Sequence, residues 1–173
     1  MHDICIETRR FVLRPLTPDD ASERYAAWFS DPDVQRYISS ATTAVSIADL
    51  RRYIDARQSD PRVLFLGIFA RDRGTHIGNI KFEPVDRAAS CAVLGIMIGD
   101  SAWRGKGAAA EVIAGATEWL ATRWGICEVA LGVAREHTGA QRAYEKAGFR
   151  VTARDDSDPR DWIRMVWRPA ARA

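Results

Sequence analysis

The stretch DSAWRGKGAAAEVI, residues 100–113, decides the fold because it reads as the point where an apolar strand ends and a helix begins. The first turn of a helix leaves main-chain N–H groups unpaired and carries about half a unit of positive charge. Gly105 and Gly107 let the backbone adopt positive φ and approach a ligand closely, and Arg104 and Lys106 add charge. The stretch therefore predicts an anion site whose natural guest is a diphosphate.

Two other phosphate-binding patterns fit this stretch less well. A Walker loop needs GxxxxGK followed by Ser or Thr, and the chain contains no such string. A dinucleotide-binding fingerprint needs a third glycine where this chain has Ala110. A bare pair of glycines is also compatible with an ordinary turn that holds sulfate or nothing, and these residues alone leave that alternative open.

The residues after the two glycines have the spacing of a helix. Apolar residues recur every three or four positions: Val112, Ile113, Ala116, Trp119 and Leu120. This period predicts an amphipathic helix over 105–123 that ends at Gly125. The following ICEVALGV, 126–133, reads as a strand. A strand, a helix and a strand in this order predict a parallel, right-handed crossover.

The first half of the chain reads mainly as antiparallel strands. FVLRPL, 11–16, alternates like a strand, and a helix is expected from Thr17 to about Phe29, broken by Asp31-Pro32-Asp33. Ser46 and Asp49 form the start signal of a second helix that runs to about Gln58. Three strands joined by short turns then predict antiparallel hairpins, at 62–71, 76–85 and 90–100.

The order of elements places the chain in the α/β class. A short helix is expected at 138–147, stopped by Gly148, with two further strands near 149–153 and 162–167. We expect a single domain over 1–173, with a mixed, mostly antiparallel central sheet of about six or seven strands, about four helices and one parallel β-α-β crossover in the C-terminal half.

Composition excludes several classes of function. The chain has 173 residues, 47% of them hydrophobic and 28% charged, and a net charge of only +2, which argues against nucleic-acid binding. No apolar run approaches the roughly 20 residues of a membrane helix. Cys5, Cys91 and Cys127 are far apart without a CxxC pair, so neither a metal site nor a disulfide framework is expected. We expect buried, inert thiols and a cytoplasmic protein.

Two strings together carry a family resemblance. RGKGAA, 104–109, and EHTGAQRAYEKAGF, 136–149, resemble the GCN5-related N-acetyltransferase (GNAT) superfamily. The resemblance spans nearly the whole chain in element order and is most specific over 92–149. The opening LRPLTPDDA…WFSDPDVQRYI is similar to the ribosomal-protein N-terminal (RimJ/RimL-like) branch, and HIGNIKF with the glycine stretch is also similar to amino-sugar acetyltransferases.

The resemblance implies acetyl-CoA as co-substrate. Main-chain amides of the glycine loop would bind its pyrophosphate, at Arg104, Gly105, Lys106, Gly107, Ala108 and Ala109. The strand before the loop would pair its backbone with the pantetheine arm, at Ile96, Met97 and Ile98. His137 stands where the family usually has an asparagine that hydrogen-bonds pantetheine, so its ring would either take that role or point to solvent.

Tyr144 matches the family tyrosine that faces the thioester sulfur, although its place on an apolar stripe also suits core packing. A phenol with a pKa of about 10 is a weaker acid than a thiol with a pKa of about 8.5, so Tyr144 is expected to hydrogen-bond the developing thiolate, with full proton donation as an option. We name no general base, because Glu111 suits electrostatic stabilisation of the helix start and Val93 replaces a glutamate common in related proteins.

The acceptor side is built from the first helices and the central strands in this family. Candidate contacts are Trp28, Phe29, Tyr37, Asn79 and Lys81. Asp155, Asp156 and Asp158 would either attract a cationic acceptor or form a solvated loop. The implied activity is acetyl transfer to a primary amine, which is a protein N-terminus, an amino sugar or another small amine, by direct transfer in a ternary complex. The alternative is a non-catalytic acyl-CoA-binding sensor or interaction module; a monomer and a homodimer both stay open.

Overall fold

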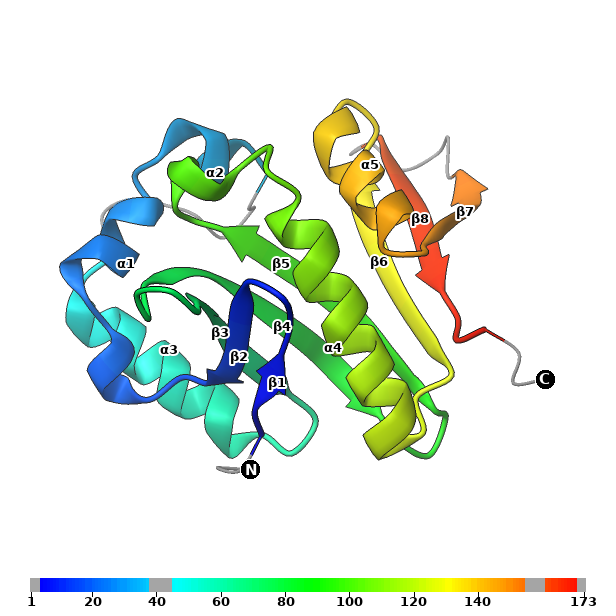
Figure 1. The fold of residues 1–173 in the computed structure, drawn as a ribbon, viewed down its shortest axis with the longest axis horizontal. Coiled ribbons are helices and arrows are strands. Elements are labelled where there is room, and N and C mark those ends of the chain that lie inside the picture. The colour runs from blue at the N-terminus through cyan, green and yellow to red at the C-terminus, as the bar shows by residue number, and fades with distance from the viewer. Residues whose placement is uncertain (1–3, 38–44, 155–160, 171–173) are drawn as a thin grey trace.

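The computed structural model describes residues 4–37, 45–154 and 161–170, and these form one eight-stranded sheet in the order β1-β2-β3-β4-β5-β6-β8-β7 (Figure 1). Neighbouring strands are antiparallel except β5 and β6, which are parallel. The strands are β1 Ile6–Glu7, β2 Phe11–Pro15, β3 Leu64–Ala70, β4 His76–Asp86, β5 Cys91–Ile98, β6 Glu128–Ala134, β7 Arg150–Arg154 and β8 Trp162–Trp167. The predicted mixed sheet and parallel crossover are confirmed; the short β1 was not predicted. The three aspartates at 155, 156 and 158 lie outside the described residues.

Five α-helices surround the sheet in the described part of the chain: α1 Glu23–Trp28, α2 Pro32–Tyr37, α3 Ile47–Ser59, α4 Ala108–Trp124 and α5 Thr138–Lys146. Two 3-10 turns, η1 Pro18–Asp20 and η2 Ser101–Trp103, complete the elements. α3 begins at the predicted capping box of Ser46 and Asp49, and α4 ends at the predicted Gly125, which has φ 68°.

The expectation of one helix from Thr17 to Phe29 is wrong. Ser22 is extended and its hydroxyl accepts from the N–H of Tyr25, so a new helix begins there after the turn of η1. The segment 31–33 also does more than break a helix. Pro32 is the first residue of α2, a position where the missing N–H of proline is not needed, and the Asp31 carboxylate accepts from the N–H of Asp33.

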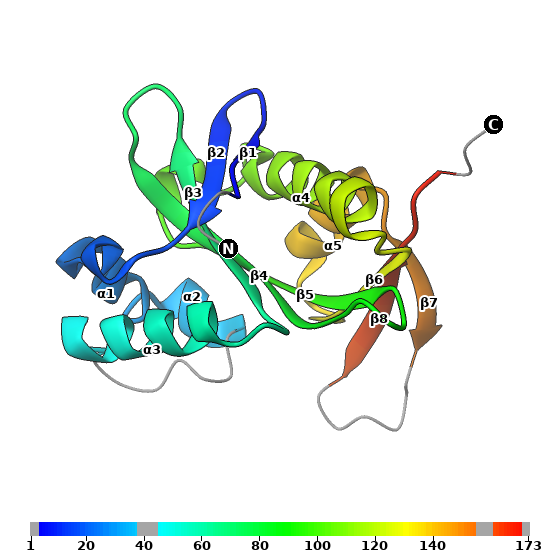
Figure 2. The ribbon, with the colours of Figure 1, turned by 90° about the horizontal axis from the view of Figure 1, so that it is seen from below.

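The helices divide between the two faces of the sheet (Figure 2). We call the face covered by α4 and α5 the α4 face, and the opposite one the α3 face. On the α4 face a large core joins Val112, Ile113 and Leu120 to the strands. On the α3 face a smaller core joins Tyr25 and Ile54 to β3. In Figure 2 the helices of the α3 face lie over β2, β3 and β4, and no helix lies over β6 and β8 on that side.

The strands β5 and β6 separate partway along their length. They pair only from Cys91↔Glu128 to Val93↔Ala130. Beyond that point β5 continues to Ile98 on β4, and β6 continues to Ala134 on β8. The two strands therefore diverge, and within the described part of the chain each has one edge without a strand partner (Figure 1). α4 begins beside the open end of β5, and α5 begins beside the open end of β6.

The expectation of buried thiols is wrong. Cys5 and Cys127 are exposed and Cys91 is half-buried. Cys127 follows the buried Ile126 and precedes β6, so it points away from the core that Ile126 enters. Within the described residues no three His, Cys, Asp or Glu side chains are grouped so as to hold a metal ion, and no helix there is both long and apolar enough to cross a membrane.

Candidate active site

The glycine loop has the geometry that its sequence predicts. Gly105 has φ 70° and Gly107 has φ 74°, and Gly107 is the residue from which α4 starts. A Cβ added at Gly105 would meet nothing within 4 Å, and one at Gly107 would meet only a guanidinium nitrogen of Arg10 at 3.8 Å. The outer side of the loop is therefore open space, and both residues hold a left-handed conformation that favours glycine.

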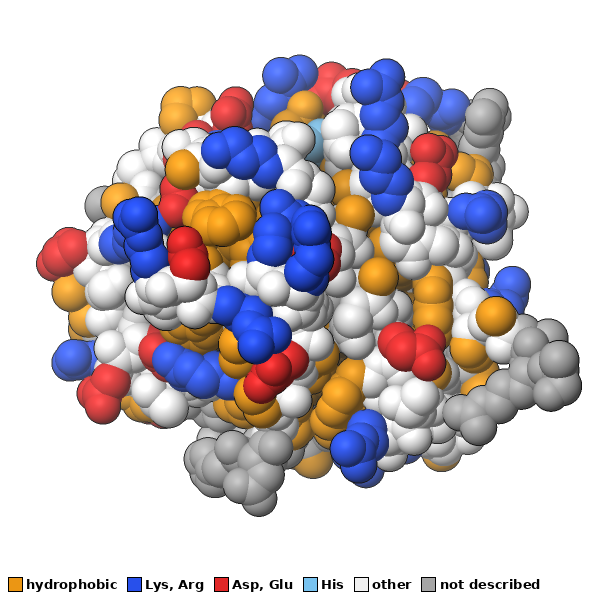
Figure 3. Space-filling view, in the orientation of Figure 1, with side chains coloured by type: hydrophobic (Ala, Val, Ile, Leu, Met, Phe, Trp, Pro, Cys, Tyr) orange, Lys and Arg blue, Asp and Glu red, His pale blue; other side chains and the backbone are white. Residues whose placement is uncertain are grey.

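The main-chain N–H groups of the loop are available to a ligand. The N–H of Arg104 donates to Ser101 O at 3.2 Å, and the N–H of Glu111 donates to Gly107 O at 3.2 Å. Between these two residues, the N–H groups of 105–110 donate to no described residue. Lys and Arg side chains gather over the start of α4 on this face (Figure 3). Open donors at a helix N-terminus, surrounded by positive charge, form an anion site.

The side chain of Arg104 does not contribute to that site. Its Nε donates to Ile98 O at 2.9 Å, its Nη2 donates to Gly99 O at 2.7 Å, and Nη2 also pairs with Asp31 at 2.8 Å. The hydrogen bond from Arg104 lowers the pKa of the Asp31 carboxyl. The expectation that Arg104 adds free charge for a diphosphate is therefore wrong, because its guanidinium ties the end of β5 to the start of α2.

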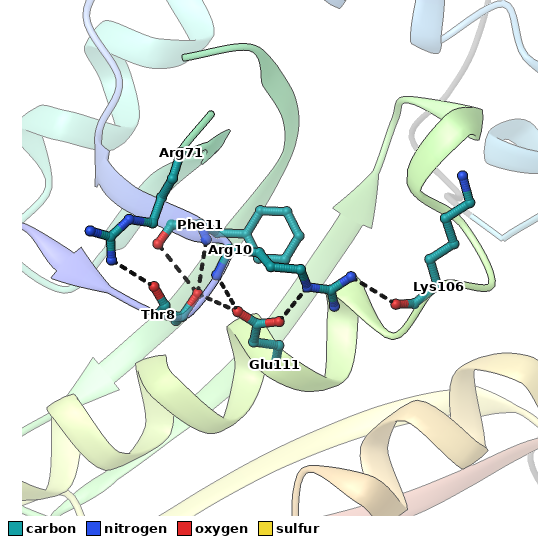
Figure 4. Close-up of polar contacts among 6 residues, drawn as sticks. All are labelled: Thr8, Arg10, Phe11, Arg71, Lys106 and Glu111. Carbon is teal, nitrogen blue, oxygen red and sulfur yellow. Dashed lines mark hydrogen bonds and ion pairs between the residues drawn. The ribbon is translucent and has the colours of Figure 1, made fainter. Parts of the chain in front are cut away.

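Glu111 fastens the start of α4 to the turn between β1 and β2 (Figure 4). Its Oε1 accepts from the hydroxyl of Thr8 at 2.9 Å and from the N–H of Arg10 at 2.7 Å, and its Oε2 accepts from Arg10 Nε at 2.7 Å. Burial alone would raise the pKa of Glu111, but these hydrogen bonds outweigh it and lower that pKa. Arg10 also donates to Lys106 O at 3.1 Å, so it holds the glycine loop directly. No motif in the sequence around Arg10 predicts that it contacts the glycine loop.

The free edge of β5 offers main-chain groups toward the opening between β5 and β6. Ser90 O accepts from the N–H groups of Cys127 and Glu128, so the main chain of Ser90 faces β6. Main-chain groups alternate in direction along a strand, so those of residues 92, 94, 96 and 98 face the same side. The main chain of Ile96 therefore faces the opening. The main chain of Ile98 faces it too, but its carbonyl oxygen already accepts from Arg104 Nε. Met97 pairs with Asn79 of β4 and faces the other way. Among residues 96–98, Ile96 thus directs its main-chain groups to this edge, and its pantetheine contact stays a prediction.

Tyr144 lies on α5, where its ring packs against the core of the α4 face, with the ring centroid of Phe149 at 6.1 Å. Its hydroxyl makes no hydrogen bond to a described residue, and burial raises the pKa of Tyr144 to about 12. The phenol is consequently neutral across the physiological range and can donate a hydrogen bond to a developing anion. The hydrogen bond of Tyr144 to a thiolate, with or without full proton transfer, stays a prediction.

His137 neither points freely to solvent nor caps its helix. Its ring stacks on Tyr37 of α2, with centroids 3.8 Å apart and planes at 10°. The neighbouring Glu136 pairs with Arg36 at 3.3 Å. Burial and the positive charge of Arg36 lower the pKa of His137. These two contacts join α2 to the start of α5, at the open ends of β5 and β6 (Figure 1). The pantetheine contact of His137 stays a prediction.

The predicted acceptor residues separate into buried and accessible ones. Trp28 is buried against Tyr25 and His76 and has only an edge at an open hollow of about 260 Å³. Asn79 is buried, with its Oδ1 at 2.9 Å from His76 Nε2 and its Nδ2 without a hydrogen-bond partner among the described residues. The remaining three candidates are half-buried and reach the surface: Phe29, Tyr37 and Lys81. Substrate contact by any of them stays a prediction.

Comparison with known proteins gives consistent results. The family model described as "Acetyltransferase (GNAT) domain" matches residues 10–150. The chain is 29% identical over 149 residues to the uncharacterized N-acetyltransferase YoaA of Bacillus subtilis (strain 168), covering 83% of this chain and 81% of that protein. Its fold matches ribosomal-protein-S5-alanine acetyltransferase from Vibrio fischeri with a TM-score of 0.83, at 10% identity and 98% coverage of both chains. It also matches spermidine N-acetyltransferase from Vibrio cholerae in complex with CoA and spermine, with a TM-score of 0.79, 20% identity and coverage of 91% and 94%.

Proposed function

Since this chain belongs to the GNAT acetyltransferase family and is an acetyl-CoA-dependent acetyltransferase, we propose that it transfers the acetyl group to a primary amine by direct attack in a ternary complex. The observation that carries the proposal is the row of N–H groups at 105–110, at the start of α4, which have no acceptor among the described residues. Residues 1–173 would act as one catalytic domain in the cytoplasm, as a monomer or homodimer.

The residues present fit coenzyme A. The pyrophosphate would accept hydrogen bonds from the amides of 105–110, with Lys106 adding positive charge. The pantetheine amides would pair with the free edge of β5 around Ile96, as an added strand does. The thioester would then lie in the opening between β5 and β6, with Tyr144 on α5 as hydrogen-bond donor to its sulfur.

Direct transfer needs a neutral amine and a stabilised leaving group. The amine nitrogen attacks the thioester carbonyl, and the C–S bond breaks as negative charge moves to sulfur. Tyr144 donates a hydrogen bond to that sulfur and keeps its proton, because a phenol with a pKa of about 12 is a weaker acid than a thiol with a pKa of about 8.5. Holding both reactants together supplies much of the rate.

Three carboxylates around the proposed site are poor candidates for a general base. Glu111, Glu83 and Asp31 are each bound by a cation, and the pKa of each is lowered. A carboxylate with a lowered pKa is a weak proton acceptor at neutral pH. The amine would therefore arrive neutral or lose its proton to water, and the pH dependence of the reaction would follow the ionisation of the acceptor.

Two measurements together separate this proposal from the non-catalytic alternative. Calorimetry measures acetyl-CoA binding, and release of free thiol measures turnover with peptide N-termini, amino sugars and polyamines. Proteins of the same fold have names that indicate acceptors of two of these kinds, a ribosomal-protein alanine and spermidine. Binding with thiol release for at least one acceptor class supports the proposal. Binding without release across the panel would favour the sensor or interaction module, and absence of binding would contradict both.

A further inference from the structure

A strip of small side chains lies on the α3 face of β5 and β6. Val93 is 43% exposed, and beside it lie Gly95 of β5 and, on β6, the half-buried Ala130 and also Gly132, against which the ring of Trp162 packs. A Cβ added at Gly95 would meet nothing within 4 Å. We call these four residues the open strip. It leads along the strands to the point where β5 and β6 separate, so it ends at the proposed position of the thioester.

One side of the open strip carries two cations and one carboxylate. Lys81 of β4 is the register partner of Gly95, and its Nζ lies 2.6 Å from Glu83 Oε2. Arg57 of α3 places its Nε 3.2 Å from the same oxygen. The half-buried Glu83 therefore neutralises only one of these two cations, and this side has one positive charge in excess.

The other side of the open strip repeats this arrangement with different residues. Arg164 of β8 is the register partner of Gly132, and its Nη2 lies 3.3 Å from Glu128 Oε1. Arg168 places its Nη2 2.6 Å from Glu128 Oε2. The side chains of Arg164 and Arg168 are 58% and 64% exposed, so both can reach a ligand. A second excess positive charge thus borders the strip.

The acceptor has to approach along this strip. α4 and α5 cover the α4 face, so an amine reaches the opening between β5 and β6 from the α3 face (Figure 2). β4 and β8 are three strand spacings apart, roughly 14 Å, which leaves room for an extended chain between them. Successive side chains of an extended chain point to opposite sides, so the residues after the first would face the two cationic borders in turn.

On the basis of the proposed function, the geometry points to a polypeptide N-terminus with acidic residues directly after its first residue as the acceptor. Carboxylates at these positions would each meet one of the borders that holds an excess positive charge, at Lys81 and Arg57 or at Arg164 and Arg168. A polycationic amine would meet like charge on both sides. Near the opening, the pair of Arg36 with Glu136 is balanced, whereas Arg104 pairs with both Asp31 and Asp33, so the one negative charge in excess there lies at the end of β5 and not on the borders of the strip.

Peptides that share one N-terminal residue test this inference. The full-length chain, which includes residues 155–160 that lie outside the described residues, is loaded with CoA or acetyl-CoA and given peptides that begin Ser-Asp-Glu, Ser-Asn-Gln or Ser-Lys-Arg. We expect the acidic peptide to bind the CoA-loaded protein about tenfold more tightly than the neutral one, and the basic one more weakly. The preference should decrease as the salt concentration rises, because the border charges are partly exposed.

Two matched variants test whether the border at Arg164 causes the preference for acidic peptides. Arg164→Glu reverses one exposed charge of the border, and we expect the acidic and neutral peptides then to bind within about twofold of each other. Arg73→Glu makes the same charge change in the turn between β3 and β4, at a side chain that is 84% exposed, and should leave the tenfold preference intact. Melting curves of both variants verify that they are folded.

Measurements of both peptide binding and turnover distinguish a failure of this inference from a failure of the proposed function. Acidic preference in binding without thiol release for any peptide, amino sugar or polyamine would support the charge inference and contradict the proposed function. Equal binding of acidic and neutral peptides, together with acetylation of either, would overturn the inference and leave the proposed function standing. Equal effects of Arg164→Glu and Arg73→Glu would also overturn it, because the preference would then reflect overall charge.

Discussion

Arg10 and Glu111, 101 positions apart in the sequence, are joined by two hydrogen bonds of 2.7 Å, one from the main-chain N–H and one from the guanidinium Nε of Arg10. The same guanidinium donates to Lys106 O. One arginine thus connects the N-terminal strands, the first turn of α4 and the glycine loop. The contact between Arg10 and Lys106 O therefore holds the glycine loop against the N-terminal strands.

The first prediction concerns the pH dependence of stability. The folded protein lowers the pKa of Glu111 below its usual 4.5, so the stabilisation is present above that value and is lost as the pH falls through the folded pKa. Glu111→Gln should reduce the free energy of unfolding by about 1–2 kcal/mol at pH 7 and by much less at pH 3. Urea denaturation at the two pH values measures both differences.

Glu118→Gln is the matched control for that prediction. Glu118 is an exposed residue of the same helix, for which the structure gives no ion pair with a described residue. Its replacement should change the free energy of unfolding by less than about 0.5 kcal/mol at either pH. A destabilisation by Glu111→Gln of the same size at pH 3 as at pH 7 would contradict the role of the ionised carboxylate.

The second prediction concerns the glycine loop. Gly107→Val places a branched side chain at φ 74° and into the space where the diphosphate would lie, so it should weaken acetyl-CoA binding at least about tenfold. Gly125→Val is the matched control, because Gly125 ends the same helix at φ 68° with open space around it. Both variants should lose similar stability, and calorimetry should find reduced affinity only in Gly107→Val. Unchanged affinity in Gly107→Val would rule out the loop as the diphosphate site.

The third prediction concerns Tyr144. Tyr144→Phe keeps the ring that packs on the core and removes the hydroxyl, which has no described hydrogen-bond partner. Turnover should fall about tenfold to a hundredfold, because the leaving sulfur loses its donor, while the dissociation constant of acetyl-CoA changes little. Steady-state kinetics and calorimetry on the same preparation measure the two effects. Unaltered turnover would mean that the hydroxyl has no part in the reaction.

The fourth prediction concerns the stack of His137 on Tyr37. His137→Phe keeps a stacking ring, whereas His137→Ala removes it, so only the alanine variant should speed amide hydrogen exchange in α2. The KM for the acceptor should rise in the alanine variant, because α2 borders the acceptor side. If both variants instead lose acetyl-CoA affinity equally, the ring nitrogens of His137 contact the pantetheine arm and the stack is incidental.

Local patterns predicted the elements that position the site. The helical period after Gly107, the stop at Gly125 and the strand that follows are all short-range signals, and together they predicted the parallel crossover of β5, α4 and β6. The positive φ of Gly105 and Gly107 was predicted for the same reason, since glycine in that context favours this conformation. Each of these features depends on residues close in sequence.

Contacts between distant segments could not be predicted in the same way. No pattern near Arg104 shows that its side chain pairs with Asp31, and none near Glu111 shows that it binds Arg10. The break before α1 was missed because Ser22 is an ordinary helix residue unless its hydroxyl caps a new helix. The excess positive charge along the open strip likewise appears only when β4 and β8 are placed on either side of it.

The most direct test of the central claim is a crystal structure of the protein with coenzyme A bound. We predict that pyrophosphate oxygens lie about 2.7–3.2 Å from main-chain nitrogens within residues 105–110, with Gly105 and Gly107 still at positive φ. A structure in which the nucleotide is bound elsewhere, or in which these amides are turned inward to protein acceptors, would contradict the account.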